Sequence, residues 1–163
     1  KRIARFGGMR PNKMAFLDTR LPDHSRDIFN MIGAGVTENA DTMPAISSVN
    51  GFTVTYNGCQ PGKGAALHSH ETCEVFIPLT GKWSVYWGDG GEYEAILDPF
   101  DVISVPTEIL RGFKNVGEEY AILMAVIEGN HPGKVGWHAD VIDSAKRTGL
   151  ELDEDGNLID HSS

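Results

Sequence analysis

Two histidines and a glutamate lie within a few residues of one another in the stretch 62–81. His68 and His70 are one residue apart, so in an extended strand their side chains point to the same face. Glu74 follows four positions after His70, and a turn between them would bring its carboxylate onto the two imidazoles from the next strand. Two neutral nitrogens and one carboxylate on one side of a metal ion leave positions open for a substrate or dioxygen. The spacing therefore predicts a metal site.

The composition is that of a soluble globular protein with one domain. The chain of 163 residues is long enough to bury a sizeable core, and none of its apolar runs approaches the roughly 20 residues that cross a bilayer. A net charge of −9 argues against partners such as nucleic acid or an anionic membrane. The two cysteines, Cys59 and Cys73, do not resemble a disulfide framework, which indicates the reducing cytoplasm.

The middle of the chain has the pattern of a β protein. Apolar and polar residues alternate in short runs that are separated by turn residues such as Asn57-Gly58 and Thr80-Gly81. Strands of about six residues at roughly ten-residue spacing are typical of a sandwich or barrel. Besides the histidine strand, we expect strands at 52–56, 74–79, 83–87, 93–97, 102–105, 110–115 and 120–127.

The two ends of the chain are expected to flank this β region. We interpret residues 1–45 as an N-terminal arm, 46–130 as the β-barrel domain and 131–163 as a C-terminal helix and tail. The tail helix is expected over 140–148, where an apolar stripe precedes basic residues and a glycine. The residues after it, at 150–159, allow a small hairpin.

The N-terminal arm has the weakest pattern. We expect a short strand at 14–17 and a short helix at 22–32, because Ile28, Phe29 and Ile32 could form one apolar side of a helix. Two glycines follow Ile32 and would end this helix.

The histidine stretch resembles the first sequence motif of the cupin superfamily, which has the form G-x5-H-x-H-x3-E-x6-G. Every slot of the motif is filled at the right spacing, by Gly62, His68, His70, Glu74 and Gly81.

The second cupin motif, G-x5-P-x-G-x2-H-x3-N, is present in a degenerate form. Pro106 and Asn115 fill its proline and asparagine slots. Phe100 and Glu108 stand where the family has glycines, and Arg111 stands where the family has the histidine that is the fourth metal ligand.

The resemblance implies an all-β fold, the cupin double-stranded β-helix or jelly-roll barrel, with the N-terminal arm and the short C-terminal helix attached to it. It also implies one divalent metal ion inside the barrel on His68, His70 and Glu74. Iron is the first expectation, and zinc, nickel or manganese are alternatives. Cupins often exchange arms between protomers, so a homodimer is expected.

Arg111 limits this interpretation. Arginine stays protonated and has no lone pair to offer a metal. Its charge also repels a divalent ion, by roughly 5–6 kcal/mol before screening at about 6 Å and an effective dielectric near 20. The site should therefore bind metal less tightly than a cupin site with four ligands.

Three arrangements of Arg111 remain open. In the first, a metal is bound and Arg111 anchors the carboxylate of a substrate, with Phe113 as an apolar wall of the pocket. In the second, no metal is bound, and Arg111 pairs with Glu74 in a pocket for a small anion. In the third, Arg111 points outward and another histidine is the fourth ligand, the candidates being His24, His131 and His138.

By resemblance to metal-dependent cupins, the protein is expected to be an enzyme that acts on a small organic acid, with an oxygenase (dioxygenase) as the first expectation. One alternative is a lyase or isomerase that uses the metal as a Lewis acid. Another is a module that binds a small anion without metal or catalysis. Tyr56 and Tyr86 could act as general acids if they face inward.

Overall fold

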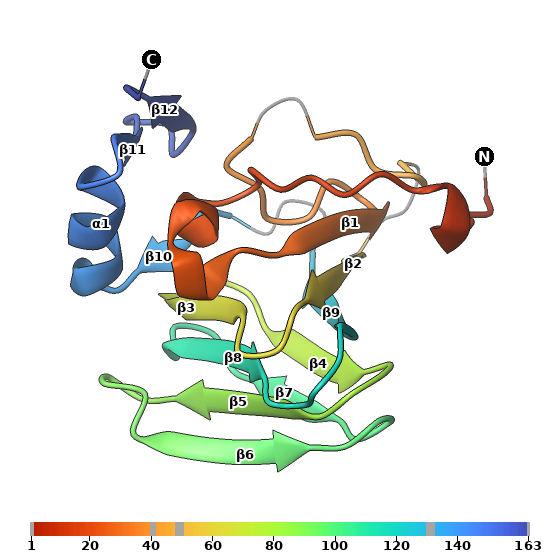
Figure 1. Cartoon of the computed structure of the whole chain (residues 1–163). Coiled ribbons are helices and arrows are strands. Elements are labelled where there is room, and N and C mark those ends of the chain that lie inside the picture. Colours follow the sequence, from red (N-terminus) through yellow and green to blue (C-terminus); the bar gives the residue numbers. More distant parts are fainter. Residues whose placement is uncertain (1, 40–41, 48–50, 130–132, 163) are drawn as a thin grey trace.

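The computed structural model describes residues 2–39, 42–47, 51–129 and 133–162, and its main feature is a pair of antiparallel sheets. The first sheet has five strands, in the order β1 (Asp27–Ile32), β2 (Phe52–Cys59), β9 (Ala121–Glu128), β4 (Glu74–Pro78) and β7 (Ile103–Val105). The second also has five, in the order β10 (Gly136–Trp137), β3 (Gly64–Ser69), β8 (Arg111–Asn115), β5 (Trp83–Trp87) and β6 (Tyr93–Leu97). The expected all-β barrel of two sheets is thus confirmed (Figure 1).

Large apolar side chains from both sheets form a core that borders the histidines. Phe113 of β8 lies at the centre, with ring centroids 5.3 Å from Phe76 of β4 and 5.8 Å from Trp83 of β5. All three are buried, as is Leu123 of β9. This aromatic cluster connects the two sheets.

The C-terminal part of the chain packs against a turn of the N-terminal arm on one side of the barrel. The C-terminal part consists of helix α1 (Ala139–Lys146) and the hairpin of β11 (Leu150–Leu152) and β12 (Leu158–Asp160), which confirms the expected tail helix and hairpin. It packs against the N-terminal 3₁₀ turn η2 (Leu17–Arg20) through the buried Leu17, Ala145 and Leu150 (Figure 1). Two other 3₁₀ turns are η1 (Phe6–Gly8) and η3 (Pro22–His24). None of the described helices is long and apolar enough to cross a membrane.

The expected helix at 22–32 is wrong, and so is the strand at 14–17. Residues 27–32 form β1, which pairs antiparallel with β2, and Leu17 begins η2. Four consecutive residues of β1 are buried, so the strand lacks the alternation that identifies a half-exposed one. A short apolar run of this kind cannot be distinguished from a helix by periodicity.

The turn expected at Asn57-Gly58 is also absent, because β2 runs through both residues to Cys59. Gly58 is needed for a close approach instead: a Cβ atom there would lie 1.8 Å from the hydroxyl oxygen of Tyr120. The glycine signal was real, but it marks a contact rather than a turn.

Strand β3, which leads to the histidines, contains a β-bulge. Its pairing with β8 moves from Ala65↔Phe113 to His68↔Arg111, so β3 has one extra residue. The bulge turns the end of β3 toward the space between the sheets.

Two residues of the degenerate second motif have strained backbones. Phe100 and Glu108 have φ angles of 74° and 61°, in the left-handed region that favours glycine. Since the Phe100 side chain is 79% exposed, Phe100→Gly removes strain and loses few contacts. We expect it to raise the free energy of unfolding by about 0.5–1 kcal/mol in urea denaturation. The matched variant Val102→Gly, at a neighbouring exposed residue without a positive φ, should lower it. Equal destabilisation by both variants would contradict this account.

Candidate metal centre

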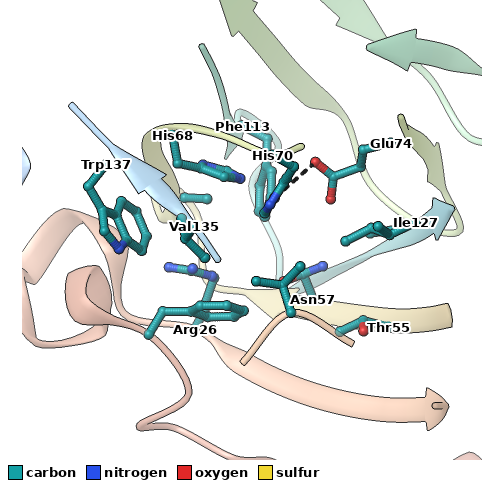
Figure 2. Close-up of a pocket in the computed structure, with 14 residues that line it drawn as sticks. Arg26, Thr55, Asn57, His68, His70, Glu74, Phe113, Ile127, Val135 and Trp137 are labelled. Carbon is teal, nitrogen blue, oxygen red and sulfur yellow. Dashed lines mark ion pairs between the residues drawn. The ribbon is translucent and has the colours of Figure 1, made fainter. Parts of the chain in front are cut away.

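The structure brings the three predicted ligands together. His68 lies near the end of β3, His70 follows that strand, and Glu74 begins β4 after a bend. One potential ligand atom from each residue lies within 4.8 Å of the other two, and His70 Nε2 is 3.5 Å from Glu74 Oε2. All three side chains are buried and line one cavity (Figure 2).

A hydrogen bond orients His68 for metal binding. Its Nδ1 lies 2.7 Å from the carbonyl oxygen of Ala66, which can only accept, so Nδ1 carries the proton and Nε2 keeps its lone pair. The amide of Ala66 in turn donates to Asp18 Oδ2 at 2.9 Å. Asp18 therefore holds the bulge of β3 from which His68 projects.

Burial keeps both imidazoles in the neutral form that can ligate a metal. It lowers the pKa of His68 well below the usual range. Burial, followed by the charge of Arg111, lowers the pKa of His70 to about 3. Burial raises the pKa of Glu74 to about 7, and the charges of Arg111 and Arg26 oppose this rise. The two imidazoles are thus already neutral at neutral pH. Of the three ligands, only the Glu74 carboxyl group must release a proton to solvent when a metal binds.

Several polar atoms of the site are buried without a hydrogen-bond partner. They include His70 Nδ1 and Glu74 Oε2. Buried polar atoms normally have a hydrogen-bond partner, and a binding site for an ion is one reason for exceptions. Two imidazoles and a carboxylate suit iron, zinc, nickel or manganese. The residues present fit a divalent metal ion.

Arg111 lies behind Glu74 rather than at the surface of the cavity. It is fully buried, its Nε is 3.5 Å from Glu74 Oε2, and its Nη2 donates to the carbonyl oxygen of Pro106 at 3.1 Å. The described residues that line the cavity include Phe113 but not Arg111. This position excludes the outward-pointing arrangement and does not support the anchoring of a substrate by Arg111.

Two of the three candidates for a fourth ligand, His24 and His138, do not join the site. His138 precedes α1 and caps it, with Nδ1 accepting from the amide of Asp140 at 3.3 Å. His24 lies in η3, outside the group of potential ligands formed by the described residues. His131 lies outside the described residues.

The lining of the cavity contains both polar and apolar side chains. Its empty space is about 440 Å³, part of it open to solvent, and the enclosed part holds only a few water molecules. Besides the three candidate ligands, polar side chains come from Arg26, Thr55 and Asn57. The walls are mostly apolar, and include Phe16, Val36, Phe113, Ile127, Val135 and Trp137.

Sequence reasoning missed Arg26, Asn57 and Trp137 as site residues. Thr55 and Asn57 alternate with apolar residues in β2, but the polar face of this strand faces the cavity. The apolar face is covered by the N-terminal arm, where the Phe6 and Tyr56 rings lie 5.9 Å apart. The alternation in β2 would have identified Asn57 as a cavity residue only if the arm had been expected to cover the apolar face of the strand.

Trp137 is held against the site by Glu38. Its Nε1 donates to Glu38 Oε1, and the amide of Leu17 donates to Glu38 Oε2, both at 2.6 Å. Burial raises the pKa of Glu38 to about 7 against these two bonds. The Trp137 ring lies 5.5 Å from that of His68, so both ends of the chain build the wall beside the metal site.

The tyrosines considered as general acids lie elsewhere. Neither Tyr56 nor Tyr86 is among the described residues that line the cavity. Tyr86 donates to the carbonyl oxygen of Ala65 at 2.6 Å, and burial raises its pKa to about 12.

The fold and the buried His-His-Glu group define a cupin barrel. The family model of the cupin domain matches residues 58–127, the part of the chain that forms the end of β2, β3 to β8 and most of β9. No curated protein matches the sequence.

Similar solved structures include proteins with different names and roles. A conserved uncharacterized protein with a double-stranded β-helix domain from Klebsiella pneumoniae is 17% identical, over 83% of this chain and 97% of that one, with a TM-score of 0.56. The polyketide cyclase RemF from Streptomyces resistomycificus is 15% identical, over 96% and 89%, with a TM-score of 0.61. The DMSP lyase DddQ from Ruegeria pomeroyi is 14% identical, over 83% and 59%, with a TM-score of 0.55. At these identities the similarity shows the fold alone.

Proposed function

We propose that this protein is a metal-dependent cupin enzyme that acts on a small organic acid at the site of His68, His70 and Glu74. The observation that carries the proposal is the group of three buried ligand atoms, within 4.8 Å of one another, on the wall of a cavity. A metal bound there would supply activation of dioxygen or of a substrate oxygen. Iron is the first candidate, because two histidines and one carboxylate are the typical ligands of non-haem iron oxygenases.

An oxygenase fits the cavity better than a lyase or isomerase does. Removal of a proton from carbon needs a base beside the substrate. Apart from the three ligands, Arg26 is the one titratable side chain among the described residues that line the cavity, and an arginine stays protonated. Chemistry driven by dioxygen and a metal does not depend on such a base. The role of the apolar walls is to exclude water and to hold the body of the substrate.

The protein is further proposed to be cytoplasmic, which is supported by two free cysteines, one of them buried. The homodimer expected from the resemblance stays a prediction.

The first test is the metal content of the purified protein. We expect close to one equivalent of a divalent metal in the wild type and an affinity about 100-fold lower or worse in His68→Ala, since the triad loses a ligand. His161→Ala is the matched control, because His161 is an exposed histidine that pairs with Glu151. Protein that stays metal-free after incubation with iron, zinc, nickel and manganese would overturn the proposal.

The second test separates the reaction types. Metal-loaded protein is incubated with a panel of small carboxylic acids, with and without dioxygen, and oxygen uptake is recorded. Turnover that requires dioxygen supports the oxygenase, whereas turnover that is equal under anaerobic conditions assigns a lyase or isomerase.

A further inference from the structure

We propose that Arg26, assisted by Asn57, binds the carboxylate of the substrate in the cavity, the role that the sequence suggested for Arg111. This inference rests on the proposed function, because it names the group that anchors its substrate. Figure 2 shows the Arg26 guanidinium below His68, between Trp137 and Asn57, on a different side of the cavity from Glu74.

Arg26 is fixed in place by the N-terminal arm. Its side chain is 3% exposed, and its Nη1 donates to Asp18 Oδ1 at 2.9 Å. The same Nη1 also faces the carbonyl oxygens of His24 at 2.8 Å and Gly64 at 3.4 Å. The Phe16 ring lies under the guanidinium, with its centroid 5.1 Å from the central carbon. A cation that is held in this way needs little reorganisation to bind a ligand.

One edge of the guanidinium has no protein partner. All of the hydrogen bonds above use Nη1, whereas Nε is buried without a partner and Nη2 makes no hydrogen bond within the described part of the chain. The N–H groups of Nε and Nη2 point the same way and match the two oxygens of a carboxylate. A buried donor without a partner destabilises the free protein, and a bound carboxylate would satisfy it.

Asn57 adds a second unpartnered polar group. Its side chain is buried, lines the cavity, and has no hydrogen bond to the described residues. An amide on the wall of the same cavity can donate to the carboxylate or contact a neighbouring oxygen of the ligand.

The charges and the size of the cavity indicate the class of ligand. Arg26 is paired with Asp18 and Arg111 with Glu74, so a bound divalent ion leaves an excess of positive charge that an anion offsets. The enclosed space is small and its walls are mostly apolar. We therefore assign the ligand as a small monocarboxylate with a compact apolar body.

The test compares propionate with propionamide, which have the same shape but differ in charge. Each is titrated by calorimetry into zinc-loaded and metal-free protein. We expect propionate to bind at least tenfold more tightly than propionamide, and this preference to disappear in Arg26→Gln while the zinc content is unchanged. Asn57→Leu should weaken propionate by a smaller factor. Arg20→Gln is the matched control, because Arg20 belongs to the same arm and pairs with Asp160 outside the cavity.

Arg26→Gln leaves Asp18 without its cation, and this variant can fail to fold. The double variant Asp18→Asn, Arg26→Gln removes both charges, so no unpaired charge is left buried, and it should also lose the preference for propionate. Unchanged propionate binding in a folded, zinc-loaded Arg26 variant would overturn the inference and leave the proposed function intact. If neither the wild type nor any variant binds metal, the proposed function fails. The comparison of propionate with propionamide in metal-free protein then decides the role of Arg26 separately.

Discussion

Asp18→Ala is expected to lower the free energy of unfolding by about 3–5 kcal/mol, the typical effect of removing one partner of a buried ion pair. Asp18 is fully buried, and its two carboxylate oxygens accept from Arg26 and from the amide of Ala66. The variant leaves a buried guanidinium without a counter-charge and a buried amide without an acceptor. Urea denaturation of the metal-free protein measures the effect.

Two further variants show whether the charge is the cause. The double variant Asp18→Ala, Arg26→Met removes both charges. Its loss of unfolding free energy should therefore be smaller than the sum of the two single losses, by up to about 3 kcal/mol in a double-mutant cycle. Asp160→Ala is the control, because its pair with Arg20 is partly exposed, and it should change stability by less than about 1 kcal/mol. A simple sum of the two single effects would mean that Asp18 and Arg26 do not depend on each other.

Asp18 should also affect the metal site from a distance. Its bond to the Ala66 amide holds the backbone whose carbonyl fixes His68. Residues that orient metal ligands typically change metal affinity by about 10–100-fold. Asp18→Ala that is still folded should bind metal more weakly by a factor in this range, although Asp18 is not among the described residues that line the cavity.

Arg111→Met is expected to tighten metal binding by about tenfold to a thousandfold. Arg111 Nε is 3.5 Å from Glu74 Oε2, so its charge lies just behind a ligand and repels a divalent ion by several kcal/mol at an effective dielectric of about 20. Methionine keeps most of the buried volume without the charge. Competition with a chelator, followed at pH 8, measures the metal affinity.

The control for this prediction is Lys114→Met on the same strand. Lys114 is exposed, so solvent and salt screen its charge, and metal affinity should stay the same. Weaker metal binding in Arg111→Met would contradict the prediction. It would mean that the orientation of Glu74 by Arg111 matters more than the repulsion.

The sequence by itself determined strands β2 to β9 of the barrel and the three candidate ligands, but not the edge strands β1 and β10. Both depend on short-range geometry: the period of two in a strand places His68 and His70 on one face, and a short bend brings Glu74 beside them. The structure gives Phe100 and Glu108 positive φ angles, at the two positions where the second cupin motif has glycines.

Only the tertiary structure decided which cation lines the cavity. Arg111 was near the site by its position in the motif, but its side chain lies behind Glu74. Arg26 comes from the arm, where a predicted helix is in fact strand β1 after a 3₁₀ turn. Its place depends on a buried ion pair with Asp18 and on contacts with residues far along the chain. Such long-range contacts have no period or spacing in the sequence, so the ligand triad could be predicted from it and the opposite wall of the cavity could not.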